Sequence, residues 1–332
     1  MRGEWTSIMH PATIAGLGGD GESIMRLDDM PESGNIEDRR GEGGGFGGGG
    51  GFGIPVGTGG LGIGGMIVLG LIGYALGIDP FVLINGANVI VGGNQGGYVQ
   101  PDTRPSGRTG TPNDEMGRFV SRVLGSTEVQ WKDIFAKDGQ TYRAPKLVMF
   151  SGATRSACGV AQSAMGPFYC PNDKEVYLDT AFFRELETRF RGCTGKACDF
   201  SKAYVIAHEV GHHVQNLLGI LPKVQQAQRA ANSRAESNHM QVMVELQADC
   251  FAGVWANHAE ERSKFLDPGD IDAALQTASA IGDDTLQRKS QGQVVPDSFT
   301  HGSAEQRKRW FSTGFREGNV KACNTFASAN RL

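Results

Sequence analysis

Hydrophobic residues between positions 203 and 218 recur at the spacing of a buried α-helix. Residues three and four apart share one helix face, and Asp199 or Ser201 can cap the N-terminus. Gly219, followed by Pro222, is typical of a C-terminus. Gly211 inside this helix costs about 1 kcal/mol relative to alanine, which predicts that another segment approaches closely there. The apolar positions are Ala203, Tyr204, Ile206, Ala207, Val210, Val214, Leu217 and Leu218.

A second long helix is predicted further along, and it carries two acidic residues among apolar ones. Glu245 and Asp249 lie four positions apart and therefore on one helix face. Carboxylates are costly to bury unless charged groups pair with them. The pair therefore indicates either a buried polar site or an ordinary exposed acidic patch. The surrounding apolar residues are Met240, Met243, Val244, Cys250, Phe251, Val254 and Trp255.

The pattern elsewhere in this half of the chain predicts a mixed fold. Residues 114–124 and 128–136 read as two helices, residues 145–150 as a strand, and residues 168–178 as a hairpin that turns at 171–173. We expect one α+β domain over residues 114–332, with a small sheet beside the helix at 203–218.

The N-terminal third has a different composition. Residues 1–53 include the glycine run 41–53 and few apolar residues, so we expect them to be mostly disordered. Residues 54–78 contain no charge, and such a helix would span about 37 Å. We predict a transmembrane segment over residues 54–84, with a glycine-rich linker bearing an apolar patch as the alternative. Residues 85–113 read as a second linker.

Basic residues predict how this segment would be oriented. Arg39 and Arg40 precede it, and no lysine or arginine lies between it and Arg104. By the positive-inside rule, the N-terminus is cytoplasmic and the C-terminal domain lies across the membrane. The pairs Gly60/Gly64 and Gly73/Gly77 have GxxxG spacing, which predicts a homodimer contact within the lipid bilayer.

Charge and cysteine content narrow the function further. The 332 residues carry 32 Lys and Arg against 36 Asp and Glu, a net charge of −4, which argues against a dedicated nucleic-acid-binding protein. All six cysteines follow the apolar segment, which suits disulfides in an oxidising compartment. Many pairings are open, and a structural zinc site in cysteines is the rival interpretation. Proximity in the sequence favours the pairs Cys158–Cys170 and Cys193–Cys198, which leaves Cys250–Cys323.

The helix at 203–218 carries the pattern HExxH as His208, Glu209 and His212. Histidines four apart can hold one metal ion, with Glu209 beside them as a general base, which is the arrangement of zinc metalloproteases. The alternative is a helix that shows these polar residues to solvent.

Two histidines leave a catalytic zinc site incomplete, because such sites take three protein ligands and keep one open position. Gln215 and Leu218 stand where the metzincin pattern has glycine and histidine. We therefore predict Glu245 as the third ligand of one Zn²⁺. Asp249 is expected to accept a hydrogen bond from a ligand histidine and so fix its tautomer.

Three longer strings carry a resemblance to a known family: GPFYCPNDKEVYLD, AYVIAHEVGHHVQ and ELQADCFAGVWA resemble the bacterial neutral zinc metallopeptidases. The similarity runs from near Met25 to the C-terminus. It implies a gluzincin, with HExxH followed by ExxxD and a zincin-like fold. It also implies a membrane-anchored protein, but the substrates do not follow from the resemblance. Our prediction is an endopeptidase that acts on peptide or protein substrates, anchored in the bacterial inner membrane with its domain in the periplasm or outside the cell.

The same resemblance assigns roles to His301 and Arg307. Related membrane gluzincins have a His-Pro segment with an arginine six residues later near the metal, and Gly302 replaces that proline here. By this resemblance, His301 donates to the developing oxyanion and Arg307 orients a carboxylate or a substrate carbonyl. The alternative is a helix that starts at Ser303, with a surface histidine and a basic first turn.

Three functions are consistent with these patterns: a membrane-anchored zinc endopeptidase, a zinc hydrolase of a non-peptide amide or ester, and a non-catalytic envelope protein stabilised by zinc. Glu209 argues against the last, because a purely structural metal site has no need of a base.

Overall fold

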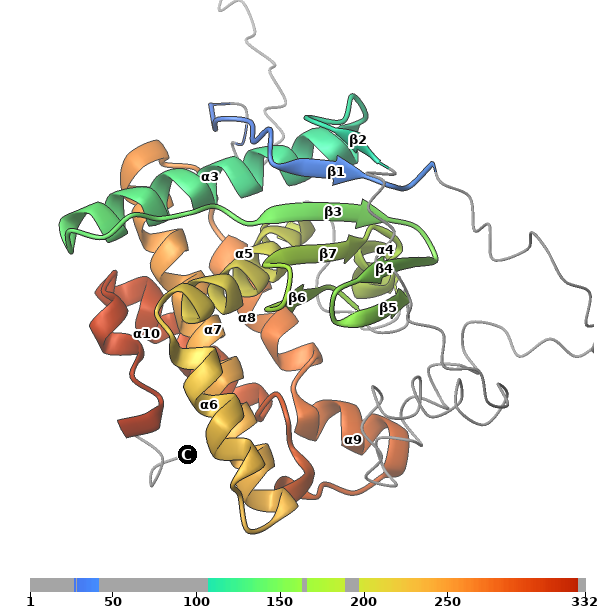
Figure 1. Cartoon of the computed structure of the whole chain (residues 1–332), viewed down its shortest axis with the longest axis vertical. Helices are drawn as coiled ribbons and strands as arrows, with labels where there is room; N and C mark the ends of the chain where they lie inside the picture. Colours follow the sequence, from blue (N-terminus) through green and yellow to red (C-terminus); the bar gives the residue numbers. More distant parts are fainter. Residues whose placement is uncertain (1–26, 28, 42–106, 163–165, 189–196, 328–332) are drawn as a thin grey trace, which may run out of the picture.

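A mixed five-stranded sheet lies beside a set of helices (Figure 1). The computed structural model describes residues 27, 29–41, 107–162, 166–188 and 197–327. The strands are β1 (Ile36–Asp38), β2 (Arg108–Thr109), β3 (Lys146–Phe150), β4 (Ala153–Ser156), β5 (Gly159–Gln162), β6 (Phe168–Cys170) and β7 (Glu175–Asp179). The helices are α3 (Glu115–Lys137), α4 (Ala181–Thr188), α5 (Ala197–Leu217), α6 (Ile220–Arg229), α7 (Arg234–Ser263), α8 (Asp270–Ala280), α9 (Asp283–Gln291) and α10 (Ala304–Glu317), with 3₁₀ turns η2 (Pro296–Ser298) and η3 (Val320–Cys323). The expected mixture of helices and a small sheet is confirmed.

The strand order in the main sheet is β2-β1-β3-β7-β6. β1, β3 and β7 are parallel, whereas β2 and β6 run antiparallel at the two edges. The strand predicted at 145–150 and the hairpin predicted at 168–178 are both present, as β3 and as β6–β7. Among the described strands, β6 is the edge strand that lies beside α5.

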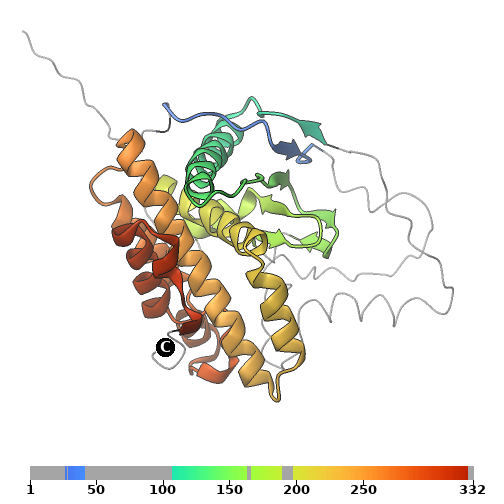
Figure 2. The ribbon, with the colours of Figure 1, turned by 60° about the vertical axis from the view of Figure 1, so that its left-hand side comes forward.

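Alternating residues of the central strands enter two different cores, because side chains point to opposite faces along a strand. Figure 2 shows the helices gathered on one side of the sheet. Leu147 and Met149 of β3 join the helical core on that side. Val148 and Phe150 face a smaller core that includes Ala161 of the hairpin β4–β5. The sheet is therefore covered on both faces where the central strands lie.

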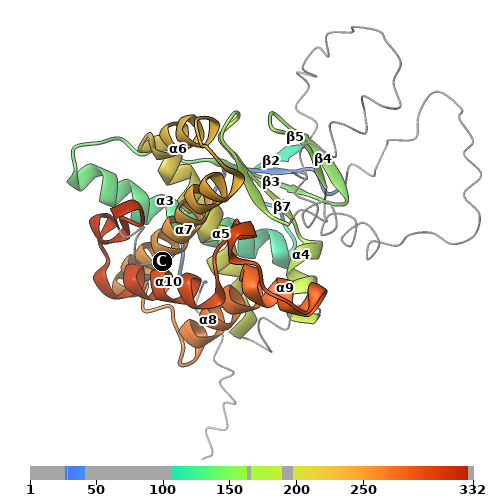
Figure 3. The same cartoon turned by 90° about the horizontal axis from the view of Figure 1, so that it is seen from below.

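Helices α5 and α7 pack closely at Gly211, and α10 packs along α7 (Figure 3). A Cβ atom at Gly211 would lie 2.9 Å from the carbonyl oxygen of Ala248. A carbon in that position would force the two backbones apart. The predicted close approach at this glycine is confirmed, and it brings the HExxH helix against the helix that carries Glu245 and Asp249.

The helix α3 is continuous over Glu115–Lys137, where the sequence pattern predicted two helices. The predicted break at 125–127 is wrong, since Gly125 and its neighbours are buried within α3. A Cβ atom at Gly125 would lie 2.0 Å from the carbonyl oxygen of Pro31. The glycine is therefore explained by a second backbone crossing the helix, and not by a helix end.

That crossing backbone belongs to residues predicted to be part of a disordered tail. Ile36–Asp38 forms β1, which pairs in parallel with β3 and antiparallel with β2. Ile36 is buried, and Glu37 is paired with Arg39 and Lys146. The prediction of disorder over residues 1–53 is thus wrong for residues 29–41. The predicted linker 85–113 likewise contributes β2 to the sheet.

The pairing of β1 with β2 constrains the predicted membrane segment. Residues 54–84 lie between these two strands in the chain and outside the described residues. A single crossing there would place β1 and β2 on opposite sides of a bilayer, so it does not fit a sheet that contains both. None of the described helices is long and apolar enough to span a membrane.

Two of the predicted disulfides are present. Cys158 is bonded to Cys170, and Cys250 to Cys323. Cys198 is also disulfide-bonded, whereas Cys193 lies outside the described residues, so the pair Cys193–Cys198 stays a prediction.

The close approach at Gly125 predicts that replacing this glycine by alanine destabilises the protein. Helix propensity alone favours Gly125→Ala by about 1 kcal/mol. We expect instead a loss of about 1–2 kcal/mol in the free energy of unfolding, because the new methyl group overlaps the backbone of Pro31. Denaturant unfolding measures this, with Gly34→Ala as control, since a Cβ there meets nothing within 4 Å. A more stable Gly125→Ala protein would mean that residues 31–33 do not pack on α3.

Candidate metal centre

Helices α5 and α7 bring three metal-binding side chains together. Nε2 of His208 lies 3.2 Å from Oε2 of Glu245, and Nε2 of His212 lies 3.5 Å from the same oxygen. One donor atom from each residue lies within 4.8 Å of the other two. Zinc bonds to nitrogen and oxygen are about 2.0–2.2 Å long, so donors to one ion lie at most about 4.4 Å apart, and both imidazole nitrogens lie within that distance of Oε2 of Glu245. Two imidazole nitrogens and one carboxylate oxygen form a donor set that zinc accepts in catalytic sites.

Burial shows that this cluster is no surface feature. His208 and Glu245 are each 7% exposed, so the alternatives of solvent-facing polar residues and of an exposed acidic patch are both wrong. Burial by itself would raise the pKa of Glu245, but the neighbouring imidazoles of His212 and His208 outweigh it and hold that pKa well below its usual range. The carboxylate is therefore ionised and available to a cation.

A buried ionic network holds the imidazole of His208 through its Nδ1 atom. Its Nδ1 lies 2.8 Å from Oδ1 of Asp249. Arg307 donates to both oxygens of Asp249, at 2.8 and 2.9 Å, and Tyr204 donates to Oδ1 at 2.6 Å. Burial opposes ionisation of Asp249, but Arg307 and His208 outweigh it and lower its pKa to about 2. An ionised Asp249 keeps the proton of His208 on Nδ1, which leaves Nε2 free for a metal.

Arg307 was expected either to orient a carboxylate or to lie in an exposed basic turn. The helix does start after Ser303, whose side chain and that of Gln306 form a capping box. Arg307 itself is 3% exposed and bonded to Asp249. The interpretation as an exposed turn is therefore wrong for Arg307, and the carboxylate that it contacts belongs to the protein.

Glu209 lies beside the three donors without joining them. Its side chain is 7% exposed and lines the cavity over the centre. Burial raises its pKa above the ordinary value, although His208 and His212 act in the opposite direction. A carboxylate with a raised pKa is a better proton acceptor at neutral pH, as a general base requires.

The cavity has a volume of about 490 Å³ and opens between the helices and the edge of the sheet. Its apolar walls include Phe168 of β6, Val205 of α5 and Leu221 of α6. Polar side chains that line it include Gln225 and Glu185. The space is large enough for several side chains of a bound chain molecule, with apolar surface available to them.

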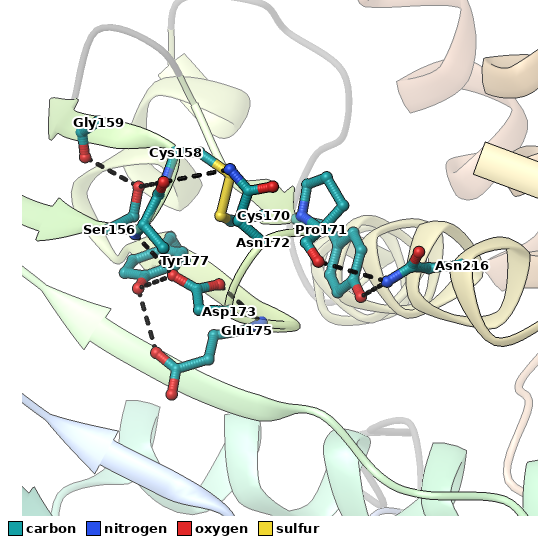
Figure 4. Close-up of a disulfide and its surroundings, with 12 residues drawn as sticks. Ser156, Cys158, Gly159, Cys170, Pro171, Asn172, Asp173, Glu175, Tyr177 and Asn216 are labelled. Carbon is teal, nitrogen blue, oxygen red and sulfur yellow. Dashed lines mark hydrogen bonds between the residues drawn. A yellow bond between two sulfur atoms is a disulfide. The ribbon is translucent and has the colours of Figure 1, made fainter. Parts of the chain in front are cut away.

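A disulfide and a hydrogen-bonded turn hold β6 in place (Figure 4). Cys170, the last residue of β6, is bonded to Cys158 in the turn between β4 and β5. The side chain of Asp173 accepts hydrogen bonds from Tyr177 and from the backbone of Ala157. At the other side of the strand, Asn216 of α5 donates to the hydroxyl of Tyr169. The edge strand is thus attached both to the hairpin and to the metal-binding helix.

His301 lies at the cavity wall, and its side chain is 52% exposed. Asp283, buried at the start of α9, accepts backbone hydrogen bonds from Thr300, His301 and Gly302 at 2.7, 2.6 and 3.0 Å. Its other oxygen lies 3.3 Å from Nδ1 of His301. The imidazole is therefore attached through Nδ1, and its Nε2 makes no hydrogen bond to the part of the chain that the structure describes.

The contacts that Gln215, Gln241 and Asp283 make at the site were not predicted from the sequence. Gln215 contacts Nδ1 of His212 at 2.9 Å, and Gln241 donates to Oε1 of Glu245 at 2.9 Å. Gln241 precedes Glu245 by four residues on α7, so helical spacing was a usable signal for it. Asp283 carried no such signal, because it meets His301 only through the tertiary fold. His213 turns away from the donors to Tyr169 and the carbonyl of Arg143, where burial lowers its pKa to about 4.

This combination defines a class: a helix-borne HExxH pattern completed by a glutamate from a second helix, over a cavity at the edge of a sheet, as in zinc metallopeptidases. Residues 25–326 match the family described as "Putative neutral zinc metallopeptidase". The chain belongs to this family, which implies zinc.

Two relatives are similar to this chain over about two thirds of its length or more. The protein named "Uncharacterized protein YpfJ" of Escherichia coli (strain K12) is 48% identical over 307 residues, which cover 92% of this chain and 100% of the relative. The protein named "Uncharacterized protein Rv2575" of Mycobacterium tuberculosis (strain ATCC 25618 / H37Rv) is 43% identical over 237 residues, or 67% of this chain and 75% of the relative. No solved structure matches the chain.

Proposed function

We propose that the protein is a zinc-dependent endopeptidase in which Glu209 is the general base. The observation that carries this proposal is the meeting of three donor atoms within 4.8 Å of one another in a cavity that Glu209 also lines. A structural metal site is usually closed by four protein ligands, whereas three ligands beside a cavity leave a position open for reactants.

Each catalytic role other than that of the metal is assigned to a residue of the protein. A zinc ion bound here supplies Lewis acidity, which polarises a carbonyl and makes water a nucleophile at neutral pH. Glu209 accepts the proton of the attacking water and returns it to the leaving amine. Burial opposes protonation of His301, but the carboxylate of Asp283 outweighs it and raises its pKa. As an imidazolium held through Nδ1 by Asp283, His301 donates from Nε2 to the oxyanion. Arg307 acts through Asp249 and keeps His208 in place.

An extended peptide is the substrate shape that this cavity favours. β6 lies at the edge of the sheet, and Phe168 and Tyr169 from it line the cavity. A peptide added along a free strand edge gains backbone hydrogen bonds and places alternate side chains in neighbouring pockets. The apolar wall formed by Val205, Leu221 and Val224 favours a hydrophobic residue next to the cleaved bond.

The test is cleavage of a diverse peptide library by the purified full-length chain. We expect cleavage that a chelator abolishes and zinc restores, with products on both sides of internal bonds. Hydrolysis of small amides or esters without peptide cleavage would favour the non-peptide hydrolase. Zinc binding without any hydrolysis would favour the non-catalytic role and contradict the proposal.

We propose further that the domain works outside the cytoplasm, in the periplasm or beyond the cell surface. Its disulfides suit an oxidising compartment. Because β1 pairs with β2 and β3, residues 29–41 share that compartment with the domain, in contrast to the cytoplasmic N-terminus expected from the basic residues. Any contact of residues 54–84 with a bilayer then begins and ends on the same side.

Thiol labelling in intact cells tests this topology. Gly34 and Ala136 are both exposed, and none of the described cysteines is free. We expect Gly34→Cys and Ala136→Cys to react equally with a membrane-impermeant maleimide, because both positions lie in one folded domain. Labelling of Ala136→Cys alone, with Gly34→Cys reacting only after lysis, would restore the single-crossing orientation.

A further inference from the structure

The second ligand histidine, His212, is held by an uncharged side chain. Oε1 of Gln215 lies 2.9 Å from Nδ1 of His212. Gln215 is fully buried, and its Nε2 donates to the carbonyl of Val244 at 2.7 Å and to Oε1 of Gln247 at 3.0 Å. His208, by contrast, has the carboxylate of Asp249 in the same role. The two ligand imidazoles are therefore oriented by chemically different partners.

The hydrogen-bond network allows only one orientation of these amides. Gln247 donates through Nε2 to the carbonyl of Cys323 at 2.9 Å, so its Oε1 faces Gln215. Turning over the amide of Gln215 would set its oxygen against two acceptors, the carbonyl of Val244 and Oε1 of Gln247. Buried acceptors left without a donor cost about 1–3 kcal/mol each. Gln215 must therefore present its oxygen to His212, which requires the proton of His212 on Nδ1.

The far end of this chain of amides is anchored to α7. Cys323, the last residue of η3, is fully buried and disulfide-bonded to Cys250 of α7. Two residues later, Thr325 donates to the carbonyl of Met243, also on α7, at 2.7 Å. The carbonyl of Cys323, which accepts the hydrogen bond from Gln247, thus lies between two contacts with α7. A continuous series of hydrogen bonds runs from η3 through Gln247 and Gln215 to His212.

We propose that Gln215 and Gln247 are positioning residues that hold His212 in the tautomer with Nε2 free for the metal, with the η3 turn as their fixed support. This inference rests on the proposed zinc site. A neutral partner suits this position, because the centre already contains the buried carboxylates of Glu209, Glu245 and Asp249. A further negative charge in so dry a place would require its own cation.

The test measures zinc affinity directly, by competition with a chromophoric chelator, on the full-length protein. Gln215→Leu removes the acceptor for His212, and we expect zinc to bind about 10–100-fold more weakly. Gln247→Leu is expected to weaken binding by less, since Gln215 keeps its contact with Val244. The double variant should match Gln215→Leu alone, because Gln247 acts only through Gln215.

Gln287→Leu is the matched control. Gln287 is also buried, and its amide bonds to Ser298 and Val295, away from the donors. We expect both Gln215→Leu and Gln287→Leu to lower the unfolding midpoint of the zinc-free protein, and only Gln215→Leu to weaken zinc binding. Unchanged zinc affinity in Gln215→Leu, or an equal loss in Gln287→Leu, overturns the positioning role. A wild-type protein that binds no zinc would overturn the proposed function itself, so the two failures are distinguishable.

Discussion

Glu209→Gln is expected to eliminate peptide hydrolysis while leaving zinc bound. Glutamine keeps the size of the side chain but cannot accept the proton of the attacking water, and loss of a general base typically costs about 10²–10⁴-fold in rate. Glu209 is not among the three donors, and it lines the cavity beside them. The zinc content of the variant should therefore equal that of the wild type.

The measurement pairs turnover of a cleaved peptide with zinc content on the same preparation. Glu187→Gln is the control, because this exposed carboxylate lies on α4 outside the cavity lining. Burial raises the pKa of Glu209, so the wild-type rate should fall as the pH drops and this base becomes protonated. Turnover that persists in Glu209→Gln would remove Glu209 from the role of base.

Glu245→Ala is expected to lose most of the zinc. The change removes the only anionic donor of the three and leaves two neutral imidazoles. Losing a partner that merely orients a ligand already costs about 10–100-fold in affinity, so loss of the ligand itself should exceed about 100-fold. Activity at ordinary zinc concentrations should disappear together with the metal.

Glu261→Ala is the matched control for that prediction. Glu261 also lies on α7, but its side chain is 68% exposed and remote from the donor cluster. Zinc content measured after dialysis should be unchanged in this control. Full zinc occupancy in Glu245→Ala would exclude Glu245 as the third ligand and redirect attention to another donor that lines the cavity, such as His301.

Cationic and hydrogen-bonding partners explain how the carboxylates of Glu245 and Asp249 can be buried in the core between helices. Asp249 is fully buried, which is tolerable because Arg307 pairs with both its oxygens. Glu245 has the two imidazoles and Gln241 as partners. A metal ion bound to the three donors would add further positive charge. The arrangement concentrates negative charge at one place inside an otherwise apolar region, which favours a cation.

Much of this site could be predicted from the sequence, because it rests on local geometry. His208 and His212 on α5, and Glu245 and Asp249 on α7, are each four residues apart, and helical periodicity places such pairs on one face whatever surrounds them. The hairpin β6–β7 was visible for the same reason, since strands and turn are contiguous. Gly211 signalled a close approach, although not the identity of the helix that makes it.

Contacts between distant segments were decided only by the tertiary structure. Ile36–Asp38 looked like part of a polar tail, yet it pairs with β3, more than a hundred residues later. Residues 114–124 and 128–136 were predicted as two helices, whereas Gly125 lies inside one helix and admits the backbone of Pro31. Gln215 could be rejected as a ligand from sequence, but its bond to His212 and its link through Gln247 to Cys323 require three separate segments to meet. Strand partners and buried amide contacts depend on which surfaces the whole chain brings together, and periodicity within one segment carries no information about that choice.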